Sequence, residues 1–284
     1  MIRIAFITSE AEANLADDDL VLRDALATRG IDVVPWVWRA PQPVALDAAL
    51  MRSCWDYHHE PLEFHAFLER LDAQGLLVWN SINVLRWNLD KTYLKELAER
   101  GALVPRTVWC SRGETSSLLD VLAHAGLDAV VIKPTISLSA HDTFRSSRAS
   151  APADQKRFAE LLAEKSLLVQ EFAPEIAEGE ISMVFVDGAF SHAVRKVPAR
   201  GDFRVQSSLG GTATPTTVRP QWISTAQAVL RQLPDLLYAR VDVVPVRDQL
   251  LWMELEALDP VLFFRFAPNA AERMADVIRS RLVR

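Results

Sequence analysis

The feature that most constrains this fold is the segment 237–260, two mainly apolar arms that meet at a polar turn around 246–249. Apolar arms of this length on either side of a short polar turn predict a β-hairpin. Glu254 and Glu256 stand two residues apart on the second arm, so their side chains face the same side of the sheet. Two adjacent carboxylates among apolar neighbours repel each other and resist burial. The hairpin therefore needs a positive charge beside this pair.

The first arm of the hairpin carries a third carboxylate. Asp242 lies on the strand that runs antiparallel to the second arm, so the hairpin places it opposite the two glutamates. Mg²⁺ prefers carboxylate oxygens, water and substrate phosphates as ligands. Asp242, Glu254 and Glu256 are therefore predicted to bind metal. The alternative is a strand edge that faces solvent and holds no ion.

The composition is that of an ordinary soluble globular protein. A chain of 284 residues, half of them hydrophobic, is long enough for two or more packed lobes. The net charge of −6 argues against a broad nucleic-acid surface, and no apolar run approaches the length of a membrane span. The opening residues 1–10 lack the features of a signal peptide. Cys54 and Cys110 form neither a disulfide framework nor a metal motif, so a cytoplasmic protein is expected.

Strand and helix patterns alternate at the start of the chain. A strand over 2–8 is followed by a helix over 17–30 and a second strand over 31–38. This order predicts a parallel α/β layer. The N-terminal α/β lobe is expected to end near Ser81.

The rest of the chain has the pattern of an α+β protein. A helix is expected over 88–101 and a polar loop over 136–148. From residue 179 onward the pattern is mostly antiparallel β, with a hairpin turn at Asp187 and Gly188. A final amphipathic helix is expected over 269–284.

Several basic side chains are candidates for binding an anion. Lys133 ends an apolar strand, where an isolated ammonium is costly unless it meets an anion. The alternative is a lysine that extends to solvent from the strand end. Arg204 precedes a Gly-Gly turn and can fork onto a phosphate or carboxylate, although a basic loop of this kind can also be simply solvated. Lys91, Arg195 and Lys196 complete this set.

The segment 167–172 is an apolar strand that ends in Gln-Glu-Phe. Such a strand can offer backbone groups to the edge of an adenine. Glu180 lies shortly after it, where its carboxylate can accept ribose hydroxyls, or it can be a surface acid in a loop.

Taken together, these segments resemble those of ATP-grasp ligases. The motifs that carry the resemblance follow one another in the family's order over nearly the whole chain: WNLDKTYL, VVIKP, VQEF…GE, KVPARGDFRVQSSLGG, ARVDVV and MELEALDP. They are similar to the branch that contains bacterial glutathione synthetase, ribosomal-protein glutamate ligases and D-cycloserine ligase. The resemblance implies an α/β N-terminal lobe over 1–81 and an α+β ATP-grasp domain whose two subdomains, 82–168 and 169–284, clamp ATP.

The resemblance also implies a role for each candidate residue toward ATP and two Mg²⁺ ions. It assigns Lys91, Lys133, Gln170, Glu171, Phe172 and Glu180 to the nucleotide, Lys196 and Arg204 to the γ-phosphate or acyl phosphate, and Asp242, Glu254 and Glu256 to the metals.

The substrate is expected to contact the N-terminal lobe. Within the segment 52–59, Arg52 can pair with a carboxylate, and Trp55, Asp56, Tyr57 and His58 can shape a small polar pocket; the alternative is loop packing between lobes. Glutathione synthetases carry a glycine-rich loop after the second lysine, whereas the corresponding segment here contains no glycine. A substrate different from that of glutathione synthetase is therefore expected.

The implied reaction joins the carboxylate of a small amino-acid-like substrate to an amine. ATP would convert the carboxylate to an acyl phosphate, and the amine would then displace phosphate. Ligation between two molecules and ring closure within one both fit the residues. The alternatives are an ATP-binding regulatory module and a phosphotransferase that stops at the acyl phosphate. The family likeness further implies a homodimer, with no nucleic-acid or membrane partner.

Overall fold

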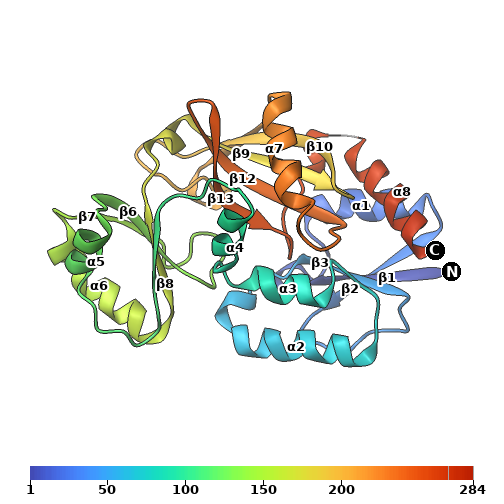
Figure 1. Ribbon diagram of the computed structural model, residues 1–284. Coiled ribbons are helices and arrows are strands. Elements are labelled where there is room, and N and C mark those ends of the chain that lie inside the picture. Colours follow the sequence, from blue (N-terminus) through green and yellow to red (C-terminus); the bar gives the residue numbers. More distant parts are fainter. Residues whose placement is uncertain (268, 284) are drawn as a thin grey trace.

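A computed structural model describes residues 1–267 and 269–283, which form three β-sheets with helices packed around them (Figure 1). One sheet is parallel, with strand order β2-β1-β3-β4, and two are antiparallel, with orders β11-β10-β9-β12-β13 and β5-β8-β6-β7. The expected combination of an α/β lobe with an α+β remainder is confirmed. None of the helices in the described part of the chain is long and apolar enough to cross a membrane.

The N-terminal lobe contains the parallel sheet. Its elements are β1 (Ile2–Thr8), α1 (Asp17–Ala27), β2 (Ile31–Val37), β3 (Ala48–Ser53), α2 (Pro61–Gln74) and β4 (Val78–Trp79). The carboxyl ends of parallel strands share one edge of a sheet, and ligands of open α/β sheets bind at that edge. Here the amide of Ser9, just after β1, donates to the carbonyl of Ser53 at 2.8 Å, so the loops after β1 and β3 lie side by side.

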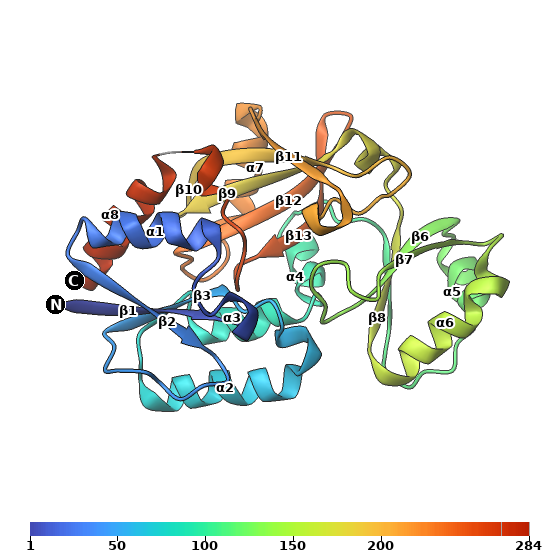
Figure 2. The same cartoon turned by 180° about the vertical axis from the view of Figure 1, so that it is seen from behind.

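The small subdomain contains the four-stranded sheet, which stands apart from the other two sheets in both views (Figures 1 and 2). Its elements are β5 (Thr107–Cys110), α5 (Leu118–Ala125), β6 (Ala129–Pro134), β7 (Phe144–Ser147), α6 (Ala151–Glu164) and β8 (Leu167–Glu171). Leu118 and Leu122 of α5 and Phe158 of α6 pack on Val130 and Ile132 of β6 to form its core.

The large subdomain contains the five-stranded sheet. Its elements are β9 (Glu180–Val186), β10 (Ala189–Val197), β11 (Thr212–Thr216), α7 (Pro220–Leu230), β12 (Tyr238–Val246), β13 (Gln249–Glu256) and α8 (Ala270–Leu282). Trp222 and Val229 of α7 pack against one face of this sheet, on Phe185 and Val243.

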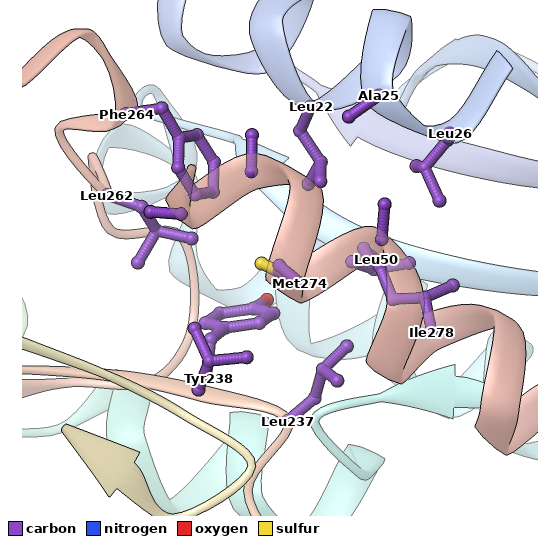
Figure 3. Close-up of a cluster of buried hydrophobic side chains, with 14 of the residues drawn as sticks. Leu22, Ala25, Leu26, Leu50, Leu237, Tyr238, Leu262, Phe264, Met274 and Ile278 are labelled. Carbon is purple, nitrogen blue, oxygen red and sulfur yellow. The ribbon is translucent and has the colours of Figure 1, made fainter. Parts of the chain in front are cut away.

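The last helix, α8, packs against the N-terminal lobe. Met274 and Ile278 of α8 pack against Leu22 of α1 and Leu50 of β3 in one buried cluster (Figure 3). α1 and α8 lie between the parallel sheet and the five-stranded sheet (Figures 1 and 2). The N-terminal lobe and the large subdomain therefore share a core.

The structure changes the expected boundaries in two places. The boundary between residues 168 and 169 falls inside β8, which pairs with β5 and β6 as far as Glu171, so the small subdomain extends past it. α3 (Ile82–Leu89) and α4 (Tyr93–Glu99) contribute to the cores beneath the parallel and five-stranded sheets rather than to the small subdomain.

Three local expectations also change. The predicted helix over 88–101 is interrupted at 90–92, where the side chain of Asp90 accepts from the amide of Thr92 at 2.8 Å and from the hydroxyl of Thr135 at 3.0 Å. The predicted loop over 136–148 contains β7, which pairs with β6. The predicted C-terminal helix ends at Leu282, and residue 284 lies outside the described residues.

Candidate active site

A cleft of about 960 Å³ is lined by residues from all three parts of the chain. The N-terminal lobe contributes the start of α1 and Trp55, and the small subdomain contributes β6 with the loop that follows it. The large subdomain contributes β10, β12, β13 and the loop 203–213. We call the loop 135–143, between β6 and β7, the phosphate loop.

Three carboxylates meet at one end of the cleft. Asp242 pairs directly with Glu254 across the β12–β13 hairpin, and Arg240 pairs with Glu256. One oxygen of each of the three acids lies within 4.8 Å of the other two. The predicted convergence of Asp242 on the glutamate pair is therefore confirmed.

Two cations lie within this group. Asp242 is 2% exposed, and its Oδ2 accepts from Arg240 Nη2 at 3.0 Å and from Lys196 Nζ at 3.1 Å. Arg240 Nη2 also contacts the carboxylate of Glu256. The protein itself thus supplies part of the positive charge that the sequence requires beside these acids.

Two lysines approach Glu254 from the other side. Lys91 Nζ lies 3.1 Å from Glu254 Oε1 and donates to the carbonyl of Ser137 in the phosphate loop at 2.6 Å. Burial lowers the pKa of Lys133, and Glu254 partly opposes this effect. An ammonium desolvated in this way favours an anionic partner.

The ionisation of the acids follows from these neighbours. Burial acts to raise the pKa of Asp242, but Arg240 and Lys196 outweigh it and hold the pKa below its usual range. Burial raises the pKa of Glu256 to about 7, and Asp242 and Glu254 act in the same direction. A cation bound here would favour the ionised form of Glu256.

The segment after β8 forms the opposite, apolar end of the cleft. The ring of Phe172 lies 6.4 Å from that of Phe203, nearly perpendicular to it, and Val131 and Met253 line the same region. The guanidinium of Arg145 lies 3.7 Å from the centre of the Phe172 ring. A flat aromatic base fits such a slot.

The hydrogen bonds of the segment 170–173 differ in detail from expectation. The amide of Glu171 donates to Arg106 and that of Phe172 to Ala129, and the Glu171 carboxylate binds Arg106. Gln170 is buried and donates to the hydroxyl of Thr107 at 3.3 Å. Ala173 is the next cleft residue, and within the described chain its amide has no hydrogen-bond acceptor.

Glu180 and Arg204 both line the cleft, and each already has a partner. Glu180, at the start of β9, lies 2.5 Å from Lys196 Nζ. Arg204 lies 2.8 Å from the carboxylate of Asp202. Lys196 therefore bridges Glu180 and Asp242, deep in the cleft, while Arg204 lies in the loop above it.

Of the residues expected to contact the substrate, two lie away from the cleft and two lie at or beside it. Arg52 is buried, donates to Asp19 at 2.8 Å, and is not among the residues that line the cleft. Asp56 also lies away from the cleft and accepts from Trp38 at 2.7 Å. The alternative of loop packing thus describes both side chains. Arg52 forms a buried ion pair with Asp19 of α1. The residues next to Arg52 in the sequence do not reveal this partner.

The other two of these residues do approach the site. Trp55 lines the cleft, and its ring is held by a hydrogen bond to the carbonyl of Asp259 at 3.1 Å. Tyr57 is buried beside a small cavity that Glu254 and Glu256 also line.

Sequence reasoning missed two features of the cleft. Arg240 stands two residues before Asp242 in a quoted motif, and the same period of two that aligned the glutamates places it on the face of Asp242. Asp18 at the start of α1 accepts from the amides of Leu262 and Phe264, which brings the loop after β13 against the N-terminal lobe. No local signal indicates that contact, because its partners are far apart in the sequence.

Residues 91–253 match the family model of the prokaryotic glutathione synthetase ATP-grasp domain. The chain belongs to the ATP-grasp family. It is an ATP-dependent ligase that forms a C–N bond. Residues 4–80 of this ATP-grasp ligase match the family model of the D-cycloserine synthetase DcsG N-terminal domain.

Individual relatives of this ATP-grasp ligase agree with the family models. The cycloserine biosynthesis protein DcsG of Streptomyces lavendulae is 28% identical over 98% of both chains. The crystal structure of D-cycloserine synthetase DcsG superposes with a TM-score of 0.87 at 27% identity, covering 99% of both chains. Glutathione synthetase of Vibrio parahaemolyticus is 26% identical over 70% of this chain and 62% of its own. D-alanine–D-alanine ligase of Bacillus anthracis, at 15% identity and a TM-score of 0.73, shares the fold.

The residues of this ATP-grasp ligase fit a Mg²⁺ site. Asp242, Glu254 and Glu256 supply the oxygen ligands that Mg²⁺ prefers, on a rigid hairpin beside a cleft of nucleotide size. An ion that binds Asp242 Oδ2 has to displace Lys196 or Arg240, both of which donate to that oxygen.

Proposed function

We propose that this ligase activates the carboxylate of a small amino-acid-like substrate as an acyl phosphate and transfers the acyl group to an amine. ADP and inorganic phosphate are the other products. The observation that carries this proposal is the cluster of three carboxylates and four cations, Lys91, Lys133, Lys196 and Arg240, at one end of a cleft whose other end is apolar.

The apolar end of the cleft suits the base of ATP, and the charged end suits its phosphates. The apolar slot at Phe172 and Phe203 would hold the adenine, with the amide of Ala173 as a donor to its edge. Glu180 lines the cleft 2.5 Å from Lys196 Nζ, and from there it would accept ribose hydroxyls. Lys91 and Lys133 would contact the phosphates, since their ammonium groups lie beside the phosphate loop and Glu254.

Asp242, Glu254 and Glu256 would hold two Mg²⁺ ions, which neutralise charge on the phosphoryl group being transferred. Lys196, Arg204 and Arg240 line the same cleft as these acids and would stabilise developing negative charge at the reacting carbonyl and phosphoryl oxygens. Catalysis by this set consists of positioning and charge neutralisation, and it needs no protein nucleophile.

The substrate would lie between Trp55 of the N-terminal lobe and the loop after β13. That space is lined by Leu15, Asp18, Val261, Phe263 and Arg265. Arg265 suits a substrate carboxylate and Asp18 an ammonium group. Ring closure within one molecule is favoured over ligation of two, because the N-terminal lobe matches the D-cycloserine synthetase model.

The test measures ADP release with Mg-ATP and a panel of small amino acids, each alone and with added amines. Ring closure predicts ADP release with one substrate and a product lighter than it by one water. Intermolecular ligation predicts release that depends on the amine. A stable acyl phosphate, trapped as a hydroxamate without amide product, would contradict the acyl transfer. No turnover across the panel, despite nucleotide binding, would favour a regulatory module.

The family likeness also predicts a homodimer of this chain. Sedimentation equilibrium of the purified protein tests that prediction.

A further inference from the structure

Three histidines gather outside the cluster of carboxylates. His58 and His59 lie in a 3-10 turn (Tyr57–His59) of the N-terminal lobe, and His141 lies in the phosphate loop. The ring centres of His58 and His59 are 3.9 Å apart, and His141 lies 5.2 and 5.3 Å from them. One ring nitrogen of each lies within 4.8 Å of the other two.

The environment of His58 is that of a ligand rather than of a solvated base. Its Nδ1 is buried and has no hydrogen-bond partner among the described residues. A neutral imidazole is the form that binds a metal ion, and a buried, unpaired ring nitrogen is available as a ligand or as a donor to an outer-shell partner.

We propose that His58, His59 and His141 bind one divalent transition-metal ion of the Zn²⁺ class, which joins the N-terminal lobe to the phosphate loop. Zn–N bonds of 2.0–2.1 Å place tetrahedral ligand nitrogens about 3.3 Å apart. The observed spacing closes to that value by side-chain rotation, because His59 and His141 are exposed. Water supplies the fourth ligand, because Asp142, whose Oδ2 lies 3.3 Å from His141 Nε2, already pairs with Lys165 Nζ at 2.5 Å.

This site differs in kind from the carboxylate site. Imidazole nitrogens select Zn²⁺ and its neighbours, whereas carboxylates and phosphates select Mg²⁺. The proposal therefore goes beyond the ligase reaction and does not depend on the identity of the substrate.

Because the site joins the phosphate loop to the N-terminal lobe, a bound ion would restrict the movement of that loop. The phosphate loop contributes Ser137 and Ser139 to the wall of the cleft, and Lys91 donates to Ser137. On its outer side Asp142 is held by Lys165 of the small subdomain at 2.5 Å. An ion that links His141 to His58 and His59 would hold the phosphate loop against the N-terminal lobe.

The test is a calorimetric Zn²⁺ titration of the full chain without an affinity tag, in excess Mg-ADP so that the carboxylate site is occupied. We expect one site in the wild type. His59→Ala and His141→Ala should each weaken its affinity about 100-fold or more, since loss of outer-shell partners alone costs 10–100-fold. His124→Ala, an exposed histidine of α5, should leave it unchanged. Co²⁺ in place of Zn²⁺ should give the visible absorption of a tetrahedral site only when all three histidines are present.

The proposal is overturned if wild type and the His59→Ala/His141→Ala double variant take up Zn²⁺ equally. The effect of the ion on the phosphate loop is measured separately, by amide hydrogen exchange. Zn²⁺ should slow amide hydrogen exchange across 138–143 in the wild type, and equal exchange with and without Zn²⁺ would contradict the link to the loop.

Discussion

Arg240 donates through Nη2 to Oδ2 of Asp242 at 3.0 Å, and both residues lie on the same face of β12. The same nitrogen contacts Glu256 on the neighbouring strand. A buried guanidinium thus shares the carboxylates that would bind metal. Protein cations hold the acids together when no ion is bound, and a bound ion replaces part of that charge.

Arg240→Met should therefore destabilise the protein most when metal is absent. Removal of one partner from a buried charge cluster costs about 3–5 kcal/mol, and Mg²⁺ should restore part of it because it binds the folded state. Urea unfolding with EDTA and with Mg²⁺ measures both effects. Arg231→Met, at an exposed position, should change stability by less than about 0.5 kcal/mol. Equal stability of the two variants in EDTA would contradict the role of Arg240.

Glu254→Gln should lower kcat/KM by at least about 100-fold, the scale of removing one group that stabilises transferring charge. The variant should also need more Mg²⁺ for half-maximal activity, because an amide is a weaker ligand than a carboxylate. Circular dichroism checks that the fold is retained, and Glu99→Gln on the exposed side of α4 is the matched control. Wild-type activity with unchanged Mg²⁺ dependence would remove Glu254 from the metal site.

Lys133→Met should weaken ATP binding about 10-fold or more by calorimetry. The same change should leave the stability of the ligand-free protein unchanged or raised, because burial of the Lys133 ammonium is unfavourable. Lys156→Met on α6, where the side chain is 87% exposed, is the control. Unchanged nucleotide affinity of the Lys133 variant would exclude contact with the phosphates.

Gly211→Ala should disturb the loop 203–213 that closes over the cleft. A Cβ at Gly211 would lie 2.3 Å from the carbonyl oxygen of Val205, and the backbone has to move to admit it. We expect the KM for ATP to rise by about 10-fold, in keeping with the sensitivity of catalysis to misplacements near 1 Å. Thr214→Ala, exposed on β11, should have no such effect, and identical KM values for the two variants would contradict the placement of this loop.

The two cysteines should react slowly with thiol reagents in the native protein. Burial raises the pKa of Cys110 to about 11, and Glu114 acts in the same direction; Cys54 is fully buried, and its pKa is raised as well. Only the thiolate reacts, so a thiol with pKa near 11 is ionised to about one part in a thousand at pH 8. The rate for Cys110 should rise with pH up to about 11. Reaction of both cysteines with the reagent within minutes at pH 8, without denaturant, would contradict this burial.

The sequence by itself determined the features that depend on neighbouring residues. Its apolar arms and polar turn predicted the β12–β13 hairpin, and the period of two placed Glu254 and Glu256 on one face of β13. The same pattern predicted Lys133 at the end of β6. Strand periodicity and turn chemistry are local, so they can be read without knowing the rest of the fold. The pairing of Asp242 with Glu254 depends in addition on a register shift between Asp242 and Val243, which the sequence did not reveal.

Contacts between distant segments depended on the tertiary structure. Arg52 was assigned to substrate from its loop, but the packing of α1 on the sheet brings Asp19 to it and removes it from the cleft. α8 completes the N-terminal core, and His141 meets His58 and His59 across two lobes. No local pattern encodes these pairings, because which buried charge or ring meets which is set by how whole layers stack.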